Sequence, residues 1–272
     1  DYLSYRLSGE RVESLRSSLE AAQGVEKNSD RIPVLTSYEL LLELSRKGSR
    51  LAVKGVRTLL KNRWLTVIVL ASLISIAFIC PGRNNAAKLD IWSVGLGAFL
   101  YQINVLLSYQ SFSGYLYSGI VILTALFMAG VSIGTWSVAR GGLKLLRSPY
   151  LLHSLFAFFA VVILIWMRAS ADVGYRAASA GFFAASLAGG FITGAFYRVV
   201  VFRALERMTG AQPAVFYAWD MFGACVGGLI GGILVYPLSG MAGMTAFIVF
   251  IHVMAAAVLT SRWKKVFPVE NL

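Results

Sequence analysis

The sequence predicts an all-α integral membrane protein, a bundle of six or seven transmembrane helices preceded by a short soluble helical segment. Of its 272 residues, 57% are hydrophobic and only 14% are charged, and the mean hydropathy of +0.69 is high for a soluble domain. After residue 63, long uncharged intervals alternate with short basic clusters. Because backbone polar groups in lipid must bond within their own segment, these intervals are expected to be helices.

Residues 1–45 have an ordinary soluble composition and are predicted to form a helix, a loop and a second helix. Apolar residues recur with the period of an amphipathic helix over 8–19, and polar residues with a proline interrupt it over 26–33. The second helix is expected to begin near Ser37. The chain begins with Asp1 and shows no signal peptide. We interpret this start as a boundary inside a longer polypeptide.

Residues 46–63 are predicted to form a basic amphipathic juxtamembrane helix. Every charged residue in this stretch is Lys or Arg, and Lys54, Arg57 and Lys61 fall on one helical face. Such a helix can bind anionic lipid, at about 1 kcal/mol for each basic side chain near the surface. The alternative is that the cluster only sets the topology. Both interpretations place it on the cytoplasmic side.

The polytopic membrane domain is expected to cover residues 64–265, with the lipid bilayer as its main partner. Single uncharged runs are close to the roughly 20 residues that cross about 30 Å of hydrocarbon. Two runs have about double that length, and we expect them to turn near 108–114 and at 237–240. The runs are 64–82, 91–139, 148–167, 177–197 and 221–261.

The distribution of basic residues predicts the topology. If Trp64–Gly82 does not cross, eighteen Lys and Arg residues in the juxtamembrane helix and in four loop regions lie on one side, and only Arg168 and Arg176 on the other. If that segment crosses, the positive-inside rule is broken. The run is nevertheless apolar enough to span. The charge pattern therefore favours six firm spans, with the C-terminus cytoplasmic.

Glycine pairs at a spacing of four residues are predicted to let helix backbones approach closely, since no Cβ intervenes. A substrate passage is the alternative interpretation. Two of the motifs, at 129–134 and 189–194, resemble one another and suggest an internal repeat of two-helix units, which is common in secondary transporters but can also arise by chance. The predicted packing glycines are Gly130, Gly134, Gly190, Gly194, Gly223, Gly227 and Gly231.

Asp220 is the one acidic residue that the sequence places well inside an apolar run. An intramembrane carboxylate costs roughly 2.5 kcal/mol or more and is a functional-site hypothesis that needs a partner. Arg198, His153 and His252 are the candidate partners. Alternatively, Asp220 lies at the interface, where a helix N-terminus favours it.

Four further polar residues are expected in the membrane. His153 and His252 raise the idea of a bis-histidine haem or a metal, but two histidines alone more often serve hydrogen-bonded packing. Gln102 and Asn104 are expected mid-helix, where interhelical hydrogen bonds are favoured over ligand contacts. We therefore predict no metal and no cofactor.

Soluble enzyme classes with known signatures are not indicated. The sequence has no phosphate-binding loop, paired catalytic carboxylates, nucleophile elbow or metal-spaced cysteines. Cys80 and Cys225 are predicted to be buried, inert thiols rather than a disulfide. The net charge of +12 is explained by loop residues at span ends, not by nucleic-acid binding.

Several short motifs resemble one bacterial family. They are 107–110, 114–117, 126–134, 220–225, 227–228 and 237–240, together with 28–33 in the soluble start. They look like the membrane domain of fused spermidine synthase-like proteins, which join multi-span regions to a Rossmann-type aminopropyltransferase-like domain. The resemblance implies a bacterial inner-membrane location and an upstream enzyme domain of the same polypeptide, of which residues 1–45 are the tail. Gln102 departs from the Glu that the family is expected to have there.

The first functional hypothesis is accordingly the membrane-anchoring, transporter-like portion of a spermidine synthase-like protein, itself without the catalytic core. The alternative is an independent small-molecule secondary transporter that uses Asp220. A haem or quinone redox subunit using the two histidines is a third. Polyamines carry several positive charges, and the few buried acids expected here argue against polyamine transport by this chain alone.

Overall fold

The structure is a computed structural model that describes residues 86–113, 117–141, 149–207 and 213–266, with four single positions before them. Those four, Glu13, Lys54, Gly55 and Thr58, are helical. The predicted soluble start, the juxtamembrane helix and the run 64–82 otherwise lie outside the described residues. Within the described ranges every regular element is helical, as the sequence predicts, and no strand occurs.

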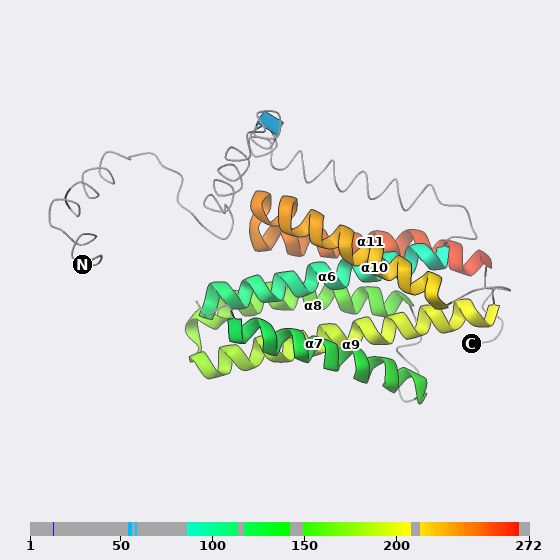
Figure 1. The fold of residues 1–272 in the computed structure, drawn as a ribbon, viewed down its shortest axis with the longest axis horizontal. Helices are drawn as coiled ribbons and strands as arrows, with labels where there is room; N and C mark the ends of the chain where they lie inside the picture. Colours follow the sequence, from blue (N-terminus) through cyan, green and yellow to red (C-terminus); the bar gives the residue numbers. More distant parts are fainter. Residues whose placement is uncertain are drawn as a thin grey trace.

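Six α-helices occur in the described ranges from residue 86 onward (Figure 1). A short 3₁₀ turn, η3, joins α8 to α9, and a π-helical segment, η4, follows α10 without a break. The elements are α6 (Ala86–Ser113), α7 (Tyr117–Ala139), α8 (Pro149–Ala169), η3 (Ser170–Asp172), α9 (Tyr175–Arg207), α10 (Pro213–Leu229), η4 (Ile230–Val235) and α11 (Tyr236–Val266).

Five segments in this part of the chain are long and apolar enough to cross a membrane, not six or seven. The expected seventh, 64–82, lies outside the described residues. The expected fifth and sixth form one continuous segment of 45 residues, because helical hydrogen bonding runs from α10 through η4 into α11. The segments are Ala87–Ser113, Gly119–Ala139, Tyr150–Ala169, Tyr175–Phe202 and Pro213–Ala257.

The 45-residue segment folds back on itself at Gly240. This residue has φ 65° and ψ −166°, a conformation that favours glycine. In a straight helix Asp220 and His252 would be about 48 Å apart. Instead they are the nearest neighbours of Gly95 and Gly97 on α6. The chain therefore reverses within the break that the sequence predicts at 237–240.

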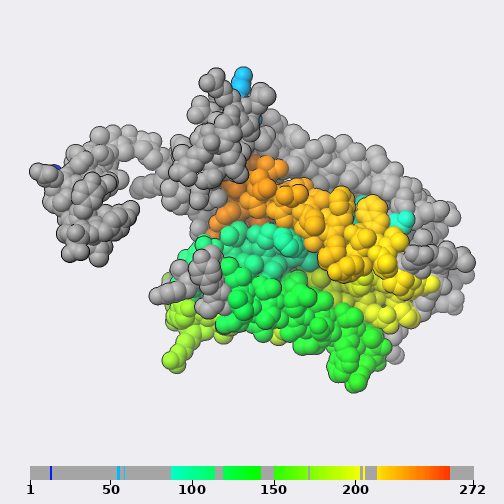
Figure 2. Space-filling model, in the orientation of Figure 1, coloured from blue at the N-terminus to red at the C-terminus, as the bar shows by residue number. Residues whose placement is uncertain are grey.

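Helix α6 is the centre of the bundle. It contacts each of the other five helices, and 78% of its most apolar stretch is buried, against 22% for α7 and 28% for α8. Figure 2 shows α10 and α7 on one face of the molecule, with part of α6 between them. Side chains on most of the α6 circumference therefore face protein.

The predicted packing glycines lie where helix backbones approach. Gly130 and Gly134 face the backbone of α9, and Gly190 and Gly194 face α7 in return. Since Gly190 lies at Phe127 and Gly194 at Val131, α7 and α9 run in the same direction. On α10, Gly223 and Gly227 lie against α6 in the same manner, and Gly231 of η4 lies against Leu100. Small residues allow the close contacts that hold apolar helices together in lipid.

The outer surface of the bundle is apolar, and its mostly apolar core also contains polar side chains. Large hydrophobic side chains are exposed on α7, α8 and α10, for example Met128, Phe158 and Phe222. The buried polar residues are Asp90, Ser93, Gln102, Asn104, Ser108, His153, Ser170, Ser179, Ser186, Ser239, Thr245 and His252.

We predict that Gly190→Ala destabilises the bundle. The new Cβ would meet the carbonyl group of Phe127, which is backbone and cannot turn aside, so α7 and α9 must separate, at about 1–3 kcal/mol. Gly232→Ala is the matched control because its Cβ would meet nothing within 4 Å, and alanine favours a helix. Thermal unfolding in detergent, followed by size exclusion, should show a lower midpoint for Gly190→Ala only. Equal midpoints would contradict close α7–α9 contact.

Candidate functional site

Polar and small residues form a stripe along one face of α6. They recur every three or four residues, so they lie above one another on the helix. From Asp90 to Ser108 the helix rises about 27 Å. The stripe consists of Asp90, Ser93, Gly97, Tyr101, Asn104 and Ser108, each of them buried.

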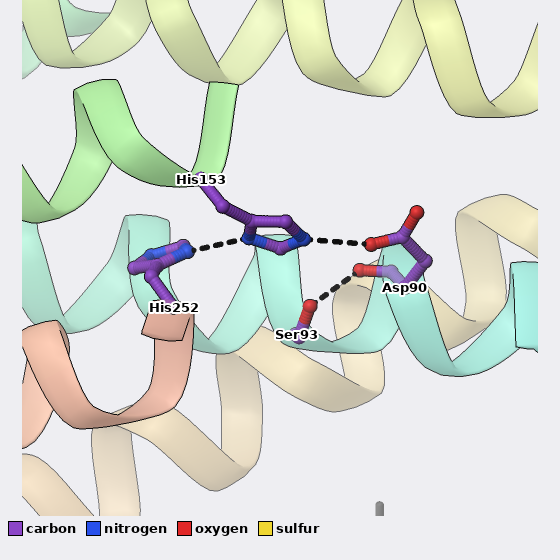
Figure 3. A network of polar contacts seen from close by, with 4 residues as sticks. All are labelled: Asp90, Ser93, His153 and His252. Atoms are coloured by element: carbon purple, nitrogen blue, oxygen red, sulfur yellow. Dashed lines mark hydrogen bonds and ion pairs between the residues drawn. The ribbon is translucent and has the colours of Figure 1, made fainter. Parts of the chain in front are cut away.

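At one end of the stripe, three side chains from three helices form a hydrogen-bonded chain (Figure 3). Oδ1 of Asp90 on α6 lies 3.0 Å from Nε2 of His153 on α8. Nδ1 of His153 lies 3.0 Å from Nδ1 of His252 on α11. All three residues are at most 1% exposed. We call this set the Asp–His–His chain.

Aromatic rings and a glycine hold the two imidazoles in place. Phe156 is stacked on His252, with ring centroids 4.6 Å apart and 10° between the planes. Phe196 on α9 meets His153 edge-on at 4.5 Å. The absence of a side chain at Gly97 leaves the space that His252 occupies, since a Cβ there would collide with the imidazole.

The two ends of the Asp–His–His chain are open. Every inner polar atom is bonded, whereas Nε2 of His252 and Oδ2 of Asp90 have no hydrogen-bond partner in the described part of the protein. Ser93 does not close the Asp90 end, because its hydroxyl donates to the backbone carbonyl of Asp90 at 2.7 Å. A buried polar atom without a partner costs about 1–3 kcal/mol and calls for an explanation.

The geometry fits neither an axial haem nor a metal centre. Two nitrogens on opposite sides of one metal ion would be about 4 Å apart, at 2.0–2.1 Å for each bond, but the Nδ1 atoms are 3.0 Å apart. His153 also uses its two nitrogens for two different neighbours, so the three side chains do not converge on one point. No cluster of three or more His, Cys, Asp or Glu side chains suited to a metal occurs among the described residues.

The rest of the stripe bonds across helices. Asn104 donates from Nδ2 to the hydroxyl of Thr245 on α11 at 3.0 Å, and Ser108 donates to the sulfur of Met241 at 3.2 Å. Beside the stripe, the Ser186 hydroxyl on α9 lies 2.7 Å from the carbonyl oxygen of Leu123 on α7 and 3.2 Å from Oε1 of Gln102. Gln102 and Asn104 therefore join helices as predicted from sequence, and each keeps one unpartnered atom, Nε2 and Oδ1 respectively.

Asp220 and Arg198 lie outside this site. Asp220 is partly buried on α10 and lies against Gly95, about 200° round α6 from Gly97. The described residues show no bond from it to its expected partners: the two histidines are joined to each other and to Asp90, and the Arg198 guanidinium lies 4.6 Å from the ring centre of Phe202.

Asp90 is the residue that the sequence interpretation missed. The sequence pattern makes Asp90 the edge of an apolar run and Asp220 the one acid well inside such a run. The structure corrects this, because Asp90 is fully buried. The signal was the spacing of polar and small residues after Asp90, which places them all on one helical face. A second correction concerns Cys225, predicted to be buried, which is a free but exposed thiol.

A separate cleft of about 400 Å³ lies between α7, α8 and α9. Its lining is almost wholly apolar, with Ile133, Leu155, Phe159 and Phe191 among the side chains. It adds no polar group to the stripe and suits a hydrocarbon chain.

Comparison of the chain with protein-family models, curated proteins and solved structures found no match in any of the three.

We predict that Thr245→Val destabilises the protein, because it removes the partner of the buried Asn104 amide. Interhelical hydrogen bonds in membrane proteins contribute about 0.6 kcal/mol on average and up to about 1.7. Thr124→Val on the exposed face of α7 is the matched control. Reversible unfolding in mixed detergent should show a lower free energy of unfolding for Thr245→Val alone. Identical unfolding curves would contradict the α6–α11 bond.

Proposed function

We propose that residues 86–266 form a transporter-like membrane domain. The supporting observation is the buried polar stripe on α6. Its rise of about 27 Å matches the roughly 30 Å hydrocarbon core of a bilayer, and it lies inside a bundle whose outer surface is apolar. The stripe therefore supplies polar groups at successive depths, as a path for a polar solute requires.

Within this proposal the domain crosses the membrane six times. The reversal at Gly240 divides the 45-residue segment into two crossings. The basic residues then place the loops after α7 and α9, together with the C-terminus, on the cytoplasmic side of a bacterial inner membrane. The turn η3 faces the other side.

This orientation can be checked with an impermeant maleimide in a chain whose two cysteines are replaced by alanine. Arg140 and Asp172 are both exposed. The reagent should label Asp172→Cys in intact cells and Arg140→Cys only in inverted vesicles. Labelling of both variants from the same side would contradict an odd number of crossings between them.

A transporter-like role explains the interior better than anchoring alone does. An anchor needs only apolar helices, whereas a buried Asp in a span costs about 2.5–3.5 kcal/mol. Unpartnered atoms on Asp90, Gln102, Asn104 and His252 add to that cost. Polar groups retained inside a span at such a cost commonly mark ion or substrate pathways.

We also propose that this domain anchors a spermidine synthase-like enzyme domain encoded upstream in the same polypeptide. The short motifs noted in the sequence support this proposal. The reading frame before the codon for Asp1 tests it: an aminopropyltransferase-type domain should be present, and its absence would refute the link. Polyamine itself is not the proposed cargo, because Asp90 is the one fully buried acid among the described residues.

Water access separates a transport path from a simple anchor. In a chain whose only cysteine is at position 108 (Ser108→Cys, with Cys80 and Cys225 replaced by alanine), a water-soluble methanethiosulfonate should react, because hydration of the path allows the thiolate to form. The matched chain keeps only Cys225, which is exposed on the apolar surface, and should stay unmodified. Mass spectrometry measures the modification of each chain after reaction in liposomes. Reaction at Cys225 but not at position 108 would contradict the proposal.

A further inference from the structure

We propose that the Asp–His–His chain is a proton-binding relay that takes up one proton at His252 and passes it to Asp90. This inference deepens the transporter-like function and rests on it. The supporting geometry is that two consecutive hydrogen bonds of 3.0 Å join the three side chains, while only the two terminal atoms lack partners.

The protons of the relay can be counted atom by atom. In the unloaded state Asp90 is a carboxylate, Nε2–H of His153 donates to it, and Nδ1–H of His252 donates to Nδ1 of His153. Nε2 of His252 is then a bare acceptor, and the net charge of the set is −1. Each hydrogen bond contains one proton, so both printed contacts are satisfied.

A proton that binds Nε2 of His252 reverses both hydrogen bonds. The Nδ1 proton of His252 moves to Nδ1 of His153, and the Nε2 proton of His153 moves to Oδ1 of Asp90. All three groups are then neutral, no heavy atom has moved, and the charge of the set has changed from −1 to 0. A neutral set suits an apolar interior better than a charged one. Rotation of the Asp90 carboxyl group, which brings the protonated oxygen to the open Oδ2 position, then lets the proton leave.

The residues of the relay lie at different depths in the bundle. Asp90 is near the start of α6, and His252 lies at Gly97, about 10 Å further along the helix axis. In the proposed orientation the relay thus extends from the cytoplasmic end of α6 toward the middle of the membrane. The Asn104–Thr245 and Ser108–Met241 contacts continue the polar stripe beyond it.

Other ionisable groups on α6, α9 and α10 are engaged elsewhere or lie on another helix face. On α6, Lys88 is half-buried and lies about 200° round the helix from Asp90, and the Tyr101 hydroxyl donates to the carbonyl of Ala185. On α9, Phe196 faces His153 and the Arg198 guanidinium lies over Phe202. On α10, Asp220 lies on another face of α6.

The experiment uses the fact that the chain has only two histidines. The 272-residue chain with ¹⁵N-labelled histidine and ¹³C-labelled aspartate, purified without a histidine tag and placed in lipid nanodiscs, is titrated by NMR between pH 4 and pH 10. We expect both imidazoles and the Asp90 carboxyl signal to change over one common pH interval. Separate titrations of the two histidines, or none in this range, would overturn the relay.

Variants sharpen the result. Asp90→Asn should displace the midpoint of the common titration by at least about one pH unit, because a charge at this distance shifts the pKa of its neighbour by that much. An unchanged midpoint would overturn the relay. Asp220→Asn, which removes a carboxylate outside the relay, is the control and should leave the midpoint unchanged. The wild-type titration remains decisive if Asp90→Asn does not fold.

The outcomes separate the relay from the transport function on which it rests. A common titration without reaction at position 108 would support the relay and contradict the proposed transport path. Reaction at position 108 together with independent titrations of the two histidines would support the transport path and contradict the relay.

Discussion

The arrangement of the bundle depends on the burial of one carboxylate. Asp90 is fully buried on the central helix, and in an apolar medium a carboxylate must be paired or neutralised. His153 supplies that pairing from α8, and His252 extends it from α11. Three helices that are distant in sequence are thereby fixed in mutual register, because a shift of one residue along any of them would move its polar side chain to another face.

Small residues make this arrangement possible. Gly97 on α6 leaves room for the His252 ring, while Gly95, on another face, allows α10 to approach. The reversal at Gly240 then brings α10 and α11 to α6 at the same level. The parallel contact between α7 and α9 uses the same physical means, because four glycines without a Cβ let the two backbones approach closely.

The sequence predicted the parts of this structure that depend on composition and local pattern. Helices, run lengths, the break at 237–240 and the positions of the packing glycines follow from apolar periodicity and from missing side chains. The pairing of His153 with Asp90 does not, because it requires knowing that α6 is central and that Asp90 faces inward. A buried Asp and an interfacial Asp look alike at the end of an apolar run. Conversely, Asp220 has apolar neighbours in sequence, yet it is only partly buried and lies on another face of α6, away from the two histidines.

The two histidines, 99 residues apart, share a hydrogen bond inside the bundle. The most direct test is a ¹⁵N–¹⁵N correlation spectrum of histidine-labelled protein in lipid bilayers, with His252→Gln as the reference. A cross-peak between the Nδ1 signals of His153 and His252 is predicted. Two uncorrelated imidazoles with the shifts of water-exposed histidine would contradict the account.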